Sequence, residues 1–190
     1  MSKDRIVLVT QNKHKLAEIT SLFNEYKISF DTTDLEKLEI RSQNVKSIAI
    51  AAAKHAYETL QRPVVVDDTG FFVEALNNFP GSYAAYVLQT IDCAGILRLL
   101  EGEKNRNAKF VTAVAFCDHN HLEVFLGEMT GTVSQKPSGK GGFGYDPIFI
   151  PEGYSQTYAE LSFSEKVRIS HRTRAFRAFL EWKTHIPDNP

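Results

Sequence analysis

The chain has 190 residues, of which 43% are hydrophobic and 24% are charged, and its formal net charge is −1. A chain of this size can bury a core without disulfides or a structural metal, either as one domain or as two small lobes that share a sheet. The near-neutral charge excludes a protein that coats nucleic acid or an anionic membrane, although it is compatible with a local basic site.

The cysteines and the N-terminal segment indicate the compartment. Cys93 and Cys117 are far apart and lack the spacing of metal ligands, which is typical of structural thiols in a reducing environment. The apolar segment at 6–9 is too short for a signal peptide or a membrane span. We therefore expect a cytoplasmic protein with no membrane partner and no nucleic-acid partner.

Strand and helix patterns alternate through the first third of the chain. A buried strand at 6–9 is followed by a helix at 13–24, a strand at 27–31, a helix at 44–60 and another buried strand at 63–66. This alternation predicts an α/β fold.

The second half has a different pattern. Segments 109–117 and 121–132 have the composition of long strands joined by a turn, which predicts an antiparallel hairpin and is compatible with a second lobe. A glycine-rich loop at 137–144 follows, and a helix at 164–182 comes last. No linker is visible, so we treat residues 1–190 as one domain whose two lobes the sequence does not separate.

The first helix begins after a polar turn that contains Thr10 and Asn12, and Lys15 lies in its first turn. A helix N-terminus has free N–H groups and attracts anions, so these residues are candidates for binding phosphate. A capped helix with solvated lysines is the alternative, and composition alone does not decide against it.

Two adjacent acids, Asp67 and Asp68, follow the strand at 63–66 and precede Thr69 and Gly70. Open α/β sheets bind ligands at the carboxyl ends of their strands, and a divalent cation would relieve the repulsion between two carboxylates. Mg²⁺ is the natural cation because it takes carboxylates together with phosphate oxygens. A simple Asp-rich turn is the equally weighted alternative.

Two further motifs lie in the second half. The stretch 141–147 is not a Walker A loop, since no Gly-Lys-Ser/Thr occurs in the required frame, but its aromatic residues and Asp146 can stack on and hydrogen-bond a base. Near the last helix, Lys166 and Ser170 are one helical turn apart, beside His171 and Arg172. A plain glycine-rich loop and a solvated helix are the alternatives.

Taken in order, these motifs resemble the inosine triphosphate pyrophosphatase family, the Ham1/RdgB-type enzymes. The resemblance rests on Thr10-x-Asn12-x-x-Lys15-x-x-Glu18, Asp67-Asp68-Thr69-Gly70, Pro80-Gly81-Ser82-Tyr83, Gly142-Phe143-Gly144-Tyr145-Asp146-Pro147 and Ser170-His171-Arg172. It extends from Ile6 to about Leu180.

The resemblance implies a fold and an activity. The fold is an α/β structure with a long, twisted mixed β-sheet flanked by helices, and with two lobes around a central active-site cleft. The activity is the Mg²⁺-dependent hydrolysis of ITP, dITP and XTP to the monophosphate and pyrophosphate by a homodimer.

The resemblance also implies roles for residues. Asp68 is the central acid, Asp67 supports it, and Asp68 and Glu39 are the metal ligands. The phosphate-binding residues are Thr10, Asn12, Lys15 and Lys54. Phe143 stacks on the base, and the residues that complete the substrate site are Thr69, Gly144, Tyr145, Asp146, Lys166, Ser170, His171 and Arg172.

Three other functions are compatible with parts of the pattern. One is a pyrophosphatase with another base preference, such as modified pyrimidines, and another is a non-catalytic nucleotide-binding module. The third is RNA binding, suggested by the arginine run Arg168, Arg172, Arg174 and Arg177, which more simply solvates the last helix.

Overall fold

The computed structural model of the protein describes residues 5–186. Its elements, in chain order, are β1 (Ile6–Leu8), α1 (Lys13–Glu25), β2 (Phe30–Thr32), α2 (Val45–Leu60), β3 (Val64–Val73), the 3₁₀ turn η1 (Glu74–Leu76), β4 (Phe79–Gly81), α3 (Ala84–Leu99), β5 (Asn107–Cys117), β6 (Leu122–Val133), the 3₁₀ turn η2 (Asp146–Ile148), β7 (Phe149–Pro151), α4 (Phe163–Ile169) and α5 (His171–His185).

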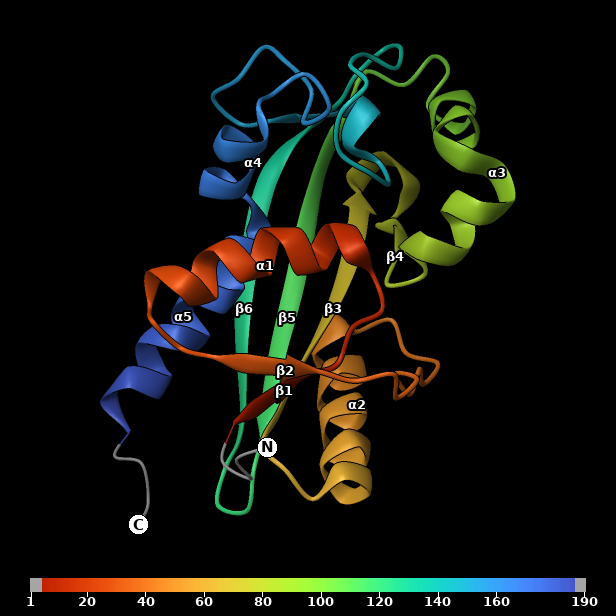
Figure 1. The fold of residues 1–190 in the computed structure, drawn as a ribbon. Coiled ribbons are helices and arrows are strands. Elements are labelled where there is room, and N and C mark those ends of the chain that lie inside the picture. Colours follow the sequence, from red (N-terminus) through yellow and green to blue (C-terminus); the bar gives the residue numbers. More distant parts are fainter. Residues whose placement is uncertain (1–4, 187–190) are drawn as a thin grey trace. The chain divides into compact units, whose positions relative to one another are not determined.

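The strands form one mixed sheet, which confirms the predicted α/β class. Seven strands are hydrogen-bonded in the order β2-β1-β3-β5-β6-β7, and β4 pairs with β3. β1 runs parallel to β2 and to β3, whereas the β3–β4 and β6–β7 pairs are antiparallel. The long strands β5 and β6 confirm the two strands predicted for the second half (Figure 1).

The chain divides into two compact units. Within the described residues, unit 1 comprises 5–68, 112–127 and 172–186, and unit 2 comprises Thr69–Val111 and Glu128–His171. The dividing points fall inside β3, β5 and β6 and after the first residue of α5, so these four elements contribute residues to both units.

The main core of unit 1 lies where α1 and α5 pack on one face of its strands. The ring centroids of Phe23 in α1 and Phe176 in α5 are 6.1 Å apart, and those of Phe116 in β5 and Phe179 in α5 are 5.4 Å apart. Val65 of β3 belongs to the same cluster, and Figure 1 shows α5 beside α1.

The opposite face of β3 is also buried. Side chains alternate along a strand, so Val64 and Val66 point away from Val65, and all three are inaccessible to solvent. Helix α2 buries an alanine-rich stripe that is not part of the α1–α5 cluster, and we therefore assign it to this second face. A strand covered on both faces explains the continuous valine run.

Unit 2 has a separate core, which is rich in aromatic side chains. Phe71 of β3 stacks on Tyr145 with a centroid distance of 4.7 Å, and Phe110 and Phe149 pack edge to face at 4.9 Å. Helix α3 covers this cluster with side chains that include Ile96.

Helix α3 was not predicted, and the last helix is not continuous. In α3, Asp92 has a φ of 55°, a non-helical conformation that divides the helix and interrupts its apolar periodicity. The predicted helix at 164–182 is two helices, because Ser170 adopts an extended conformation with a ψ of 150° between α4 and α5. None of the helices within 5–186 is long and apolar enough to cross a membrane.

Candidate active site

The turn after β1 places Lys15 beside β3. The Val9 N–H donates to the Val65 carbonyl at 3.0 Å, after which the chain turns into α1. Asn12 caps this helix, because its side-chain oxygen accepts from the N–H groups of His14 and Lys15 at 3.0 and 3.2 Å. The capped helix is therefore the local structure, and two first-turn N–H groups are already satisfied.

Asp67 lies at the centre of a buried network of ion pairs in unit 1. Lys15 Nζ is 2.8 Å from Asp67 Oδ2, and Arg172 Nε is 3.5 Å from the same oxygen. Arg172 also donates to Glu18 Oε2 at 2.5 Å, and both side chains are almost fully buried. Two helices thus direct cations at one strand carboxylate, with Glu18 holding the guanidinium from the other side.

The network keeps Asp67 ionised. Burial alone would raise the pKa of Asp67, but Lys15 and Arg172 outweigh burial and lower it below the usual range. The pKa of Lys15 is lowered as well, first because Lys15 is buried and then because Arg172 and Lys37 oppose the attraction of Asp67. The Asp67 carboxylate is therefore surrounded by cations, whereas Lys15 lies near one anion, Asp67, and two other cations.

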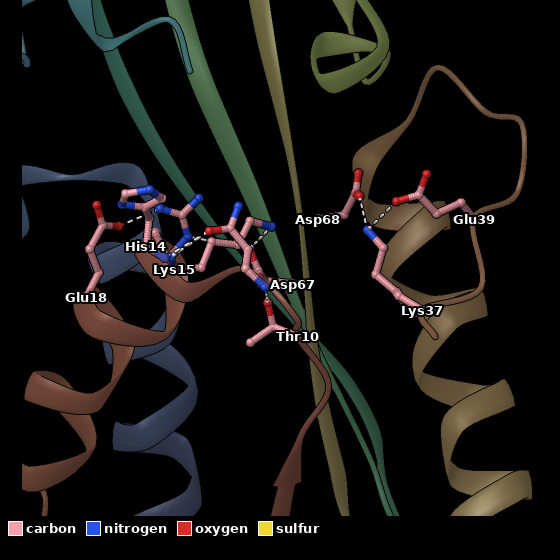
Figure 2. A network of polar contacts seen from close by, with 10 residues as sticks. Thr10, His14, Lys15, Glu18, Lys37, Glu39, Asp67 and Asp68 are labelled. Atoms are coloured by element: carbon pink, nitrogen blue, oxygen red, sulfur yellow. Dashed lines mark hydrogen bonds and ion pairs between the residues drawn. The ribbon is translucent and has the colours of Figure 1, made fainter. Parts of the chain in front are cut away.

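Asp68 points to the other face of β3. The strand continues through both acids, so the prediction that it ends at residue 66 is wrong, and the two neighbouring side chains point in opposite directions. Lys37, from the segment between β2 and α2, donates to Asp68 Oδ1 at 2.7 Å and lies 3.4 Å from Glu39 Oε1 (Figure 2). Asp67 and Asp68 therefore form ion pairs with different lysines.

Asp68 and Glu39 fit a divalent cation better than Asp67 does. Asp68 Oδ2 is buried and has no hydrogen-bond partner among the described residues. Glu39 contacts the Lys37 ammonium that also contacts Asp68, and its side chain is 75% exposed. Burial raises the pKa of Asp68, and Lys37 offsets this effect only in part. Within 5–186 no three His, Cys, Asp or Glu side chains cluster as metal ligands. Mg²⁺ commonly takes only one or two carboxylates, and water and phosphate oxygens complete its shell.

Unit 2 holds a second polar cluster, centred on Asp146. The Phe143 N–H donates to Asp146 Oδ2 at 2.7 Å, and Lys166 Nζ donates to the same oxygen at 2.6 Å. The Lys166 ammonium also lies 4.5 Å from the centroid of the Phe143 ring. Gly142 has a φ of 70°, and a Cβ there would come within 2.1 Å of the carboxylate, so glycine is required for this turn.

The remaining predicted base-site residues of unit 2 are more deeply placed. His171 stacks on Phe110 with a centroid distance of 4.7 Å and an interplanar angle of 17°. Ser170 is fully buried, and Tyr145 lies in the aromatic core, where its hydroxyl donates to the Ala84 carbonyl at 2.9 Å. Gly144 accepts a hydrogen bond from the Cys93 thiol. Helix α3 thus holds the turn 143–146 at two points.

Comparison with known proteins decides the family. The model of the Ham1 family matches residues 6–182 of the chain. The chain belongs to the Ham1 family.

Relatives of this Ham1-family protein include proteins named for a nucleotide activity. It is 46% identical over 179 residues to the dITP/XTP pyrophosphatase of Methanopyrus kandleri, with 94% of this chain and 95% of that protein covered. It is 48% identical over 181 residues to the dITP/XTP pyrophosphatase of Pyrobaculum aerophilum, with 95% and 97% covered.

Solved structures of the family have the same fold. The structure of a HAM1 protein from Coxiella burnetii has a TM-score of 0.88 at 30% identity and covers 96% of this chain and 100% of that one. The nucleoside-triphosphatase / dITP/XTP pyrophosphatase of Mycobacterium abscessus has a TM-score of 0.75 at 29% identity, with 94% and 99% covered.

The structure of this Ham1-family protein brings several of the predicted residues of unit 1 into contact. Thr10 accepts from the Asn12 N–H, and this turn leads into Lys15, which reaches Asp67. Arg172, predicted at the base together with His171, binds Glu18 and Asp67 within unit 1. Thr69 is the residue of β3 after Asp68 and is partly buried.

A lysine that the sequence analysis did not single out, Lys37, contacts Asp68. Lys54 lies on α2 beside the β5–β6 turn, where it lines a surface hollow with Cys117, whereas Lys37 contacts Asp68. The sequence pattern did not indicate Lys37 because residues 33–44 have neither helical nor strand periodicity. The available signal was its place two residues before Glu39, since such positions in an extended segment face the same side.

Two of the four arginines in the run of the last helices form ion pairs with acids, whereas Arg168 and Arg174 are exposed. Arg172 is buried with Glu18, and Arg177 Nη1 lies 2.9 Å from Glu25 Oε1. Burial of Arg172 and pairing of Arg177 leave a smaller positive surface than the RNA-binding alternative assumed.

Proposed function

We propose that this protein hydrolyses the triphosphates of non-standard purine nucleosides, such as dITP, XTP and ITP, to the monophosphate and pyrophosphate with Mg²⁺. The names of its relatives support the substrate class. The observation that carries the chemistry is the difference between the two adjacent acids. The pKa of Asp67 is lowered and that of Asp68 is raised, a separation typical of acids with different catalytic tasks.

Asp68 is the acid that orients the attacking water and accepts its proton. Its raised pKa makes the carboxylate a better proton acceptor than an ordinary aspartate. Asp68 and Glu39 would hold Mg²⁺, which when bound neutralises phosphate charge and lowers the pKa of coordinated water. Glu39 is largely exposed and can turn toward the cation.

Lys15 and Arg172 supply positive charge for the triphosphate. Both are anchored by Asp67, so their positions are fixed before the substrate arrives, and catalysis of phosphoryl transfer depends mainly on such positioning and charge neutralisation. The Lys15 side chain remains 17% exposed and can therefore contact a phosphate oxygen. Thr10 and Asn12 lie in the turn before α1 and bind the phosphates beside Lys15.

The aromatic cluster of unit 2 recognises the base. Phe143 is partly exposed and offers a ring for stacking, and Lys166 provides a donor beside that ring. His171, stacked on Phe110 in the same unit, provides a second donor. Hypoxanthine and xanthine have an acceptor at O6, whereas adenine has an amino group there. Donors directed at O6 would be left unpaired with adenine, and a mismatch of that kind gives strong discrimination.

We also propose that the protein acts in the cytoplasm as a homodimer, without nucleic-acid or membrane partners. Exposed aromatic side chains near the start of α3 support association, since Tyr86 is 67% and Tyr83 44% exposed. Light scattering after gel filtration measures the mass directly. A mass of about 21.4 kDa, that of one chain, would contradict the dimer.

The test of the activity is pyrophosphate release from ITP, dITP, XTP, ATP, GTP and CTP, with Mg²⁺ and with EDTA. We expect release from the first three with Mg²⁺, little from the others, and none in EDTA. If the protein binds ITP but releases pyrophosphate from no nucleotide, it is a nucleotide-binding module. Release from modified pyrimidine nucleotides instead would identify a pyrophosphatase with a different base preference.

A further inference from the structure

Lys37 is the side chain that joins the two predicted metal ligands. Its ammonium lies 2.7 Å from Asp68 Oδ1 and 3.4 Å from Glu39 Oε1, and Figure 2 shows it between the two carboxylates. The Lys37 side chain is only 19% exposed, and Asp68 is buried. A single positive charge therefore stands between the two acids that fit a divalent cation.

Lys37 and a metal ion cannot both occupy this position. Mg²⁺ binds carboxylate oxygens at roughly 2.0–2.1 Å. An ammonium within hydrogen-bond distance of the same carboxylates would crowd the ion and repel it as a like charge. Removing the ammonium without replacement would leave the buried Asp68 carboxylate without a counter-ion, which is costly.

The side chain and its segment allow a second position. Lys37 lies in residues 33–44, which form no helix or strand, and its four-carbon stem carries a compact charge with rotatable donors. A nucleoside triphosphate brings several negative oxygens to the site, which gives the ammonium a new partner when the metal takes its place.

We propose that Lys37 is an internal counter-ion that occupies the metal position in the free protein and moves to a phosphate oxygen of the substrate when metal and nucleotide bind. This inference rests on the proposed function. In the free protein Lys37 competes with the metal, and with nucleotide present it does not, so nucleotide and metal each strengthen the binding of the other. Lys37 thereby links metal binding to the presence of substrate.

The test is the affinity for Mn²⁺, used as a spectroscopic probe, measured by electron paramagnetic resonance in wild type and in Lys37→Met. Without nucleotide, we expect the variant to bind Mn²⁺ roughly tenfold more tightly, because no ammonium has to be displaced. A non-hydrolysable ITP analogue should tighten Mn²⁺ binding in wild type and much less in the variant. The KM for ITP should rise, since one phosphate contact is lost.

Lys46→Met is the matched control, because Lys46 is an exposed lysine on α2, and it should leave all three quantities unchanged. Lys37→Gln serves as a second variant if circular dichroism shows that the methionine variant does not fold. Equal Mn²⁺ affinity in wild type and both Lys37 variants, or no Mn²⁺ binding by any of them without nucleotide, would overturn the inference. Magnesium-dependent pyrophosphate release from ITP by wild type would in those cases leave the proposed function standing.

Discussion

The two units neutralise their buried charges in different ways. In unit 1, Asp67 forms ion pairs with both Lys15 and Arg172, and Arg172 also forms an ion pair with Glu18. In unit 2, Asp146 and Lys166 form a buried pair; the carboxylate also accepts from a backbone N–H, and the ammonium lies over the ring of Phe143. Several charges held close together place positive charge where phosphate can be bound, whereas the pair beside Phe143 places a hydrogen-bonding edge next to an aromatic ring. The contrast supports phosphate chemistry in unit 1 and base recognition in unit 2.

The largest expected effect comes from removing Asp68, the acid that we assign to phosphate chemistry in unit 1. Asp68→Asn keeps the shape of the side chain but removes its charge and its ability to accept a proton. We expect kcat for ITP to fall about 10³-fold or more, because general-base assistance alone contributes roughly 10²–10⁴-fold. Pyrophosphate release measures the loss, and an unchanged thermal transition shows that the fold is intact. Turnover within a few-fold of wild type would exclude Asp68 from the mechanism.

The second prediction concerns the stability of the unit 1 network. Glu18→Ala leaves Arg172 buried without one of its two acids, and breaking a buried ion pair costs about 3–5 kcal/mol. The control is Glu25→Ala, which breaks the exposed pair with Arg177 and should cost less than about 1 kcal/mol. Urea denaturation gives both free energies of unfolding. Equal losses would mean that the buried network contributes no more than a surface pair.

The third prediction separates base recognition from phosphate chemistry. Lys166→Met removes the buried donor beside Phe143, and we expect the ratio of kcat/KM for ITP to that for ATP to fall about 10- to 100-fold. That range corresponds to about 1.4–2.7 kcal/mol for a lost buried hydrogen bond. Lys109→Met, in an exposed pair with Glu128, is the control in the same unit. An unchanged ratio would remove Lys166 from base selection.

The smallest expected effect is at Lys54. Because Lys54 lies beside the β5–β6 turn and Lys37 contacts Asp68, Lys54→Ala should change kcat/KM for ITP by no more than about twofold, as is usual for exposed positions. Steady-state kinetics of wild type and Lys54→Ala with ITP measure this ratio. A loss above tenfold would return Lys54 to the phosphate-binding set that the family resemblance implied.

Local signals in the sequence determined much of the fold. The valine strand, the asparagine-capped helices α1 and α2, and the β5–β6 hairpin follow from residue patterns that act within a few positions. Helix α3 and the break at Ser170 did not follow from such patterns. Asp92 interrupts the apolar periodicity of α3, and Ser170 is extended between α4 and α5, and neither conformation is visible in the residue pattern.

The sequence also determined which residue types meet in the site, but not which partner each one finds. Asp67 and Asp68 are neighbours in the chain, yet the pleat of β3 sends one toward α1 and α5 and the other toward Lys37. Their opposite pKa shifts therefore come from tertiary contacts, since adjacent aspartates have the same intrinsic acidity. Side-chain chemistry is encoded locally, whereas the charge that faces each acid depends on segments far away in the sequence.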